Sequence, residues 1–169
     1  MRLWPHTVFA ALLLTPASAE ALCIYRGVDN ARTSLRQEYA DARWVVRARV
    51  LGATDGVVEA GLSDAGLPWT VYRLQVVRSY KGELPQQITY FTMRDSGGFY
   101  MDRPWVPLPQ GHDIGGEYLL FLNPIPSYRG QPRAERGAAL VNYNCGQSRP
   151  WREVSAASRR VLASLSIRR

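Results

Sequence analysis

The sequence predicts a mainly β protein, a small closed or partly open barrel of five short strands flanked by two helices. The first observation behind this prediction is a set of five short runs of alternating or continuous apolar residues, separated by stretches rich in turn-forming residues. The second is that helical periodicity occurs only before the first of these runs and after the last. We expect the sheet to close because closure removes exposed strand edges.

The five runs differ in how strongly apolar and polar residues alternate. Along residues 43–51, apolar side chains such as Val46 alternate with Arg47 and Arg49, which is typical of a half-buried strand. The run at 117–122 is almost entirely apolar, so we expect this strand to be covered on both faces. The remaining strands are expected at residues 70–80, 87–93 and 138–143.

A short helix is expected before the strands and an amphipathic helix after them. Asp29 or Asn30 is placed to cap the first helix, which we expect to run to about Ala40. Residues 150–167 have their apolar side chains along one side, which predicts a helix packed on the barrel, with a membrane-surface helix as the alternative. Long loops are expected at residues 52–68, 94–116 and 123–137.

The first 19 residues have the features of a secretory signal peptide. Arg2 precedes a short apolar run at 8–14, and Pro16 is followed by the small residues of Ala17-Ser18-Ala19. Cleavage is expected after Ala19, or after Ala21 in a second frame. We therefore expect an exported protein, periplasmic or secreted, without a transmembrane segment. Its expected parts are a signal peptide at 1–19, a domain at 20–150 and a C-terminal helix at 151–169.

The chain is basic, with a formal net charge of +7 at pH 7. Its arginines are scattered and form no dense patch, and export argues against nucleic acid as a partner. The excess charge favours anionic partners such as lipid headgroups, cell-surface polymers or acidic proteins.

The two cysteines lie on either side of the predicted barrel. Export exposes them to an oxidising compartment, where an even number suits one bridge, so we predict a Cys23–Cys145 disulfide. Such a bridge closes a loop of about 120 residues and contributes on the order of 5 kcal/mol in the chain-entropy model. Two free thiols and an intermolecular bridge are the alternatives.

Candidate catalytic groups are few. Asp95-Ser96-Gly97-Gly98 is similar to the nucleophile motif of trypsin-like serine proteases, but His112, the histidine that remains after cleavage, follows Ser96 instead of preceding it. One histidine and two bridged cysteines are also too few for a typical zinc site. We therefore predict no catalytic residue, metal or cofactor. A small hydrolase that uses Ser96 and His112 is kept as an alternative.

The order of the features resembles the netrin-like family, the OB-fold barrel of the tissue inhibitors of metalloproteinases and their bacterial relatives. The resemblance covers roughly residues 22–150. It implies a five-stranded Greek-key OB-like barrel, a disulfide from the N-terminal segment to the end of the barrel, which matches Cys23 and Cys145, and a role in protein binding. The matching segments are Cys23, Tyr39-Ala40-Asp41-Ala42, Trp44–Val50, Tyr72–Val76, Ser79-Tyr80-Lys81-Gly82, Gly116–Phe121 and Asn144-Cys145-Gly146.

The chain departs from the inhibitors of this family at its N-terminus. Their first residue is a cysteine whose free amine chelates the protease zinc, whereas at least one residue precedes Cys23 here. We therefore expect a non-catalytic binding or accessory module whose partner is an exported or cell-surface protein, with inhibition of an exported peptidase as the alternative. The expected contact surface joins the loop at 94–114 to the segment near Cys23. Its residues are Tyr25, Arg94, Phe99, Tyr100, Arg103, Trp105 and His112.

Overall fold

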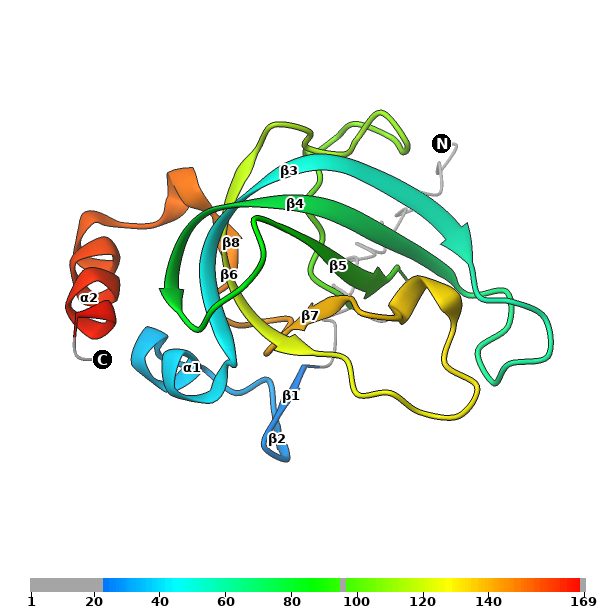
Figure 1. Cartoon of the computed structure of the whole chain (residues 1–169), viewed down its shortest axis with the longest axis horizontal. Helices are drawn as coiled ribbons and strands as arrows, with labels where there is room; N and C mark the ends of the chain where they lie inside the picture. The colour runs from blue at the N-terminus through cyan, green and yellow to red at the C-terminus, as the bar shows by residue number, and fades with distance from the viewer. Residues whose placement is uncertain (1–22, 95–96, 168–169) are drawn as a thin grey trace, which may run out of the picture.

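A computed structural model describes residues 23–94 and 97–167. The predicted signal peptide and Ser96 therefore lie outside the described residues. The described chain is built around one strongly curved sheet, with both helices to one side of it (Figure 1). No helix among these residues is long and apolar enough to cross a membrane.

Five strands of this sheet close into a barrel. The strand order is β3-β4-β5-β7-β6-β8, and β3 also pairs with β6, which closes the ring. All these pairings are antiparallel except β5–β7, which is parallel and has a single residue pair. The predicted mainly β, OB-like barrel is confirmed. The strands are β3 (Trp44–Val57), β4 (Pro68–Lys81), β5 (Gln87–Met93), β6 (Glu117–Pro124), β7 (Ala139–Val141) and β8 (Arg149–Pro150).

The first two barrel strands are longer than predicted. Residues expected in a loop at 52–68 extend β3 to Val57 and start β4 at Pro68. Glycine favours a loop assignment, yet Gly56 lies in the strand, where the Trp69 ring of the paired strand occupies the place that a Cβ would take. Register shifts along β3 are typical of the bulges that let a long strand curve around a barrel.

The N-terminal helix begins later than predicted. Residues 24–29 form the hairpin of β1 (Ile24–Tyr25) and β2 (Val28–Asp29). Asn30, one of the two expected caps, has a φ of 49° and uses its side chain to accept the Cys23 N–H at 3.2 Å. The cap is Ser34 instead, whose hydroxyl accepts the Gln37 N–H at 3.2 Å and starts α1 (Leu35–Asp41).

The C-terminal segment is divided where one helix was predicted. A 3₁₀ turn, η2 (Trp151–Glu153), precedes α2 (Ala156–Ser166). The hydroxyl of Ser155 accepts the Ser158 N–H at 3.1 Å, so a cap interrupts the predicted helix near its start. A second 3₁₀ turn, η1 (Arg133–Glu135), lies in the expected loop at 123–137.

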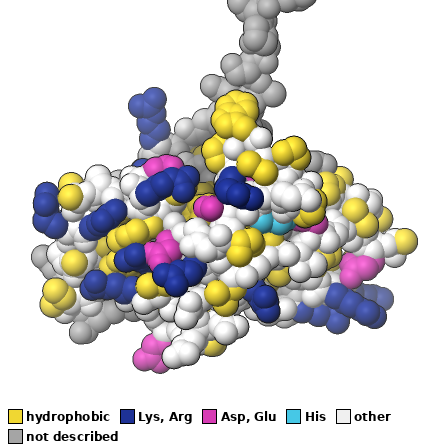
Figure 2. Space-filling view, turned by 90° about the horizontal axis from the view of Figure 1, so that it is seen from above, with side chains coloured by type: hydrophobic (Ala, Val, Ile, Leu, Met, Phe, Trp, Pro, Cys, Tyr) yellow, Lys and Arg dark blue, Asp and Glu magenta, His cyan; other side chains and the backbone are white. Residues whose placement is uncertain are grey.

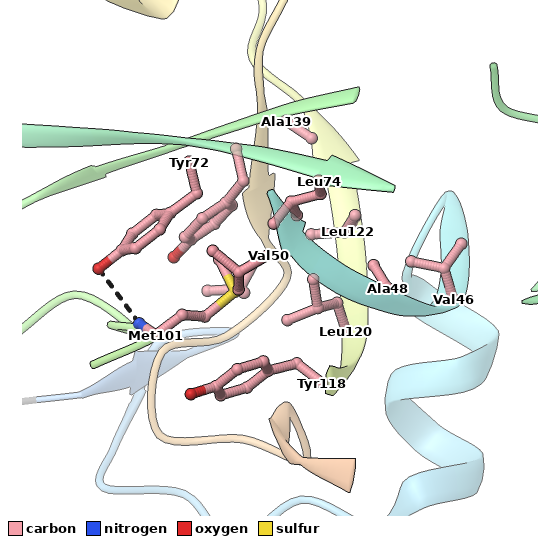
Figure 3. Packing of buried hydrophobic residues seen from close by; sticks show 12 residues of the cluster. Val46, Ala48, Val50, Tyr72, Leu74, Met101, Tyr118, Leu120, Leu122 and Ala139 are labelled. Atoms are coloured by element: carbon pink, nitrogen blue, oxygen red, sulfur yellow. Dashed lines mark hydrogen bonds between the residues drawn. The ribbon is translucent and has the colours of Figure 1, made fainter. Parts of the chain in front are cut away.

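Two apolar clusters lie on opposite faces of β6. Leu120 and Leu122 belong to the cluster that includes Tyr72 and Met101 of the barrel interior (Figure 3). The alternate residues of β6 face the helices, where they join Tyr39 of α1 and Leu162 of α2. The prediction that this strand is covered on both faces is therefore confirmed.

A disulfide joins Cys23 to Cys145 across a sequence separation of 122 residues. It holds the β1–β2 hairpin against the segment that follows β7. The Tyr143 hydroxyl adds a hydrogen bond to the Ala31 carbonyl at 3.1 Å, and the buried carboxylate of Glu38 accepts the Gln147 N–H at 2.8 Å. The segment at 143–147 is thus bound to the N-terminal hairpin, to the residues after it and to α1.

Candidate functional site

The long loop after β5 leads to a cluster of polar side chains. We call the described residues 97–116 the mouth loop, which lies above β3 in Figure 1. Asp102 and His112 pair as an isolated bridge, and the Asp113 N–H donates to the Met101 carbonyl at 2.9 Å. The loop is therefore a closed excursion, with a base at Asp102 and His112 and a tip that we define as Arg103–Gly111.

Polar side chains from β3, from β4, from the residue after β5 and from the mouth loop meet at this base. His112 lies at its centre, with only 5% of its side chain exposed. Its Nε2 lies 2.8 Å from Asp55 Oδ2, and its Nδ1 lies 3.0 Å from Asp102 Oδ1. Both ring nitrogens of His112 therefore face carboxylate oxygens. We call this group the base cluster: Asp55, Thr70, Tyr72, Arg94, Asp102 and His112.

Arg94 supplies the guanidinium of the base cluster, and its side chain is 12% exposed. It follows β5 and donates from Nε to the Thr70 hydroxyl at 2.6 Å and from a terminal nitrogen to the Tyr72 hydroxyl at 3.0 Å. It also forms an ion pair with Asp102, and its guanidinium lies 4.7 Å from the centre of the Tyr100 ring. These contacts tie the end of β5 to β4 and to the mouth loop.

The carboxylate of Asp102 is the acceptor on which the cluster converges. Burial by itself raises the pKa of Asp102, but hydrogen bonds from Arg94, Tyr72 and His112 outweigh burial and hold that pKa below its usual range. The same Tyr72 hydroxyl donates to Asp102 at 2.8 Å, and burial followed by this hydrogen bond raises the pKa of Tyr72. Asp102 is therefore ionised and Tyr72 protonated at neutral pH.

The polar groups of the base cluster contact one another, and this limits what the cluster can do chemically. Both ring nitrogens of His112 already contact carboxylates, so neither is free to take a proton from a nucleophile. In the described part of the chain, no group of three or more His, Cys, Asp or Glu side chains is arranged to hold a metal ion. Its hydrogen bonds and ion pairs connect the mouth loop to the strands of the barrel.

The tip of the mouth loop is exposed and largely apolar, whereas its base is buried and polar. Trp105 is 100% exposed and has a φ of 67°, which is uncommon for an aromatic residue. Val106 and Leu108 are exposed by 37% and 42%. Hydrogen bonds between backbone groups, from Arg103 N to the Gly111 carbonyl at 2.7 Å among them, fold the tip on itself. An apolar side chain is thus held in solvent by an ordered loop.

An open pocket of about 530 Å³ lies beside the base cluster. Trp69, Leu108 and Pro109 supply apolar walls, and Asp55 and Arg94 lie at the polar side. Since these two charged groups already have partners in the base cluster, the pocket offers apolar contact more than free charge.

The structure divides the seven predicted contact residues into separate groups. Tyr25 is buried against Tyr143, with ring centres 5.0 Å apart, near the disulfide. Phe99 packs edge-on against Tyr118, and Tyr100 covers Arg94. Arg94 and His112 belong to the base cluster, and Arg103 and Trp105 belong to the exposed tip.

Sequence reasoning missed the two aspartates that hold His112. Asp55 pairs with Thr70 across β3 and β4, and Thr70 donates to it at 2.5 Å. Polar residues at facing positions of two apolar strands are a weak sign of a buried polar site. Asp102 had no comparable sign, because it lies in an irregular loop, where alternation of apolar and polar residues does not indicate which side chains are buried.

A second candidate site lies where the barrel is least closed. Beyond the Tyr90–Ala139 pair, no further pair joins β5 to β7 among the described residues. A groove of about 290 Å³ follows this seam. We call it the Cys23 groove, because Cys23 and the 59% exposed Ile24 lie along it. Other lining residues are Phe91, Met93, Leu140 and Asn144.

The sequence matches no protein-family model and no curated protein. The base cluster with its loop and the Cys23 groove are therefore the features that bear on function.

Proposed function

We propose that this protein is an exported, non-catalytic binding module of the netrin-like type whose partner is another exported or cell-surface protein. The disulfide supports export, because such bridges persist in oxidising compartments. The closed barrel supports a scaffold role, since it provides a rigid frame on which loops and strand edges are presented.

The observation that carries the proposal is the Cys23 groove. Its two sides are the edges of β5 and β7, which diverge after a single residue pair. An extended peptide adds to such edges through main-chain hydrogen bonds, and neighbouring pockets select its side chains. Phe91 and Met93 on one side and Leu140 on the other provide apolar contacts for those side chains. The partner therefore presents an extended segment to the groove.

The base cluster supports the absence of catalysis. A catalytic histidine needs a nitrogen that is free to exchange a proton with substrate or nucleophile. His112 has none, because Asp55 and Asp102 occupy both. Its role is to hold the mouth loop on the barrel.

Site-specific photo-crosslinking in the cell envelope tests the protein-binding proposal. A photoreactive amino acid replaces Ile24 at the rim of the groove, and in a matched variant it replaces Val77, which is 42% exposed on β4. We expect a discrete protein adduct from position 24 and none from position 77. Identical adducts from both positions, or no adduct from position 24, would contradict the proposal.

A further inference from the structure

We propose that the tip of the mouth loop docks on an anionic lipid bilayer. This inference goes beyond the protein-binding function and does not depend on it, because the tip shares no residue with the Cys23 groove. From Arg103 to Gly111 the chain contains no acidic residue. Its exposed side chains include the apolar Trp105, Val106 and Leu108 together with Arg103.

Burial of the apolar side chains of the tip would favour its transfer from water into the bilayer. Trp105 is fully exposed, so its ring gains the whole benefit of burial when it enters an apolar phase. Tryptophan favours the boundary between lipid headgroups and chains, where the ring is buried and its N–H stays near polar groups. Val106 and Leu108 flank it and extend the apolar surface.

The backbone of the tip is also suited to a low-dielectric environment. Pro104, Pro107 and Pro109 have no N–H to desolvate. The Arg103 and Gly111 N–H groups donate inside the loop, to the Gly111 and Pro107 carbonyls, each at 2.7 Å. Since unpaired N–H groups are the main cost of placing irregular backbone near lipid, this composition lowers that cost.

The base cluster prepares the tip for docking. It fixes both ends of the excursion through Asp102 and His112, so the tip is already ordered before it meets a surface. A loop that is ordered in advance loses less conformational entropy on binding. The inserted residues therefore keep more of their burial free energy as affinity.

Charge selects an anionic surface. The protein has a formal net charge of +7, and Figure 2, seen from above, shows Lys and Arg side chains spread across this face with fewer Asp and Glu side chains among them. The acids next to the tip have partners: Asp102 pairs with Arg94, and Asp113 accepts the Tyr118 hydroxyl at 2.8 Å. Attraction to acidic headgroups therefore adds to insertion of the tip.

Co-sedimentation with vesicles tests the inference. The protein recovered after export is mixed with vesicles of phosphatidylglycerol and phosphatidylcholine, and separately with phosphatidylcholine alone. We expect binding to the anionic vesicles and about tenfold weaker binding by Trp105→Asn, the loss that follows from removing one buried aromatic ring. Asparagine tolerates the left-handed backbone at this position, so the loop keeps its conformation.

Two further variants control this experiment. Tyr128→Asn removes a 53% exposed aromatic side chain from a different loop and is expected to bind like the parent. Leu108→Ser weakens binding through a second tip residue and serves if Trp105→Asn unfolds. Lipids with brominated chains are expected to quench the tryptophan fluorescence of the parent more strongly than that of Trp105→Asn.

Three results would overturn the inference. One is that the parent does not bind anionic vesicles. Another is that binding is unchanged in both tip variants, which would mean that the dispersed arginines act without the tip. The third is that photo-crosslinking from position 105 gives a discrete protein adduct while vesicle binding is absent, which would assign the tip to a protein partner.

Discussion

The base and the tip of the mouth loop lie next to each other in the chain but have opposite environments. At the base, Asp102 accepts hydrogen bonds from Tyr72 and His112 and pairs with Arg94. At the tip, Trp105 is fully exposed. This difference separates the part of the loop that fixes its position from the part that projects into solvent. Buried ionic contacts hold the base, whereas Trp105 is exposed and, in the docking that we propose, meets the bilayer.

Removal of the Asp102 carboxylate is the most severe test of this division. We expect Asp102→Ala to lower the free energy of unfolding by about 3 kcal/mol, because the mostly buried Arg94 loses its close ion-pair partner and His112 loses one of its two carboxylate contacts. Denaturant titration measures the change. Asp64→Ala removes an exposed acid and is expected to have little effect. Equal losses in both variants would show that the base cluster does not anchor the fold.

Low pH is expected to weaken the contacts of Asp102 in the base cluster and so to lower the free energy of unfolding. The folded-state pKa of Asp102 is lowered, so its contribution is fully present above the unfolded value of about 3.9 and is lost as pH falls through the lower folded value. Stability measured from neutral pH into this acid range should therefore decline. In Asp102→Asn this part of the decline should be missing, and an unchanged acid limb in that variant would contradict the assignment.

A smaller effect is expected when the base loses one neutral donor. Tyr72→Phe removes the hydroxyl that donates to Asp102 and accepts the Met101 N–H at 3.2 Å, while the ring stays in the core. We expect a loss of about 1 to 2 kcal/mol and faster hydrogen exchange of the Met101 amide. If that amide keeps its protection, the hydroxyl does not hold the loop.

The tip should contribute least to stability. Because Trp105 is fully exposed, Trp105→Asn is expected to change the free energy of unfolding by no more than about 0.5 kcal/mol. Thermal or denaturant unfolding measures this. A loss comparable to that of Asp102→Ala would mean that the tip is also part of the scaffold.

The strands were predictable because local alternation decides them. The β5 run at 87–93 has the predicted bounds, and β6 has the expected burial on both faces. The predicted start of α1 was wrong. Asp29, Asn30 and Ser34 are all good caps, and only the formation of a hairpin by residues 24–29 leaves the cap to Ser34. The extra length of β3 and β4 places Trp69 over Gly56, a contact between strands that local pattern cannot reveal.

The candidate sites were less predictable than the strands. Arg94, His112 and Trp105 were expected to share one surface, yet the first two are held in the base cluster and only Trp105 projects into solvent. The difference arises because Asp55, the partner of His112 Nε2, lies 57 residues away in the sequence. No local pattern specifies such a pair.

The sequence alone determined the mainly β class, the two flanking helices and the pair of cysteines that form the disulfide. These features follow from short-range periodicity and from a count of residues. Only the tertiary structure decided which polar side chains are buried, which aromatic side chain is exposed and where the barrel seam opens. Burial and ion pairing depend on which distant strands meet when the barrel closes, and that information exists only in the folded chain.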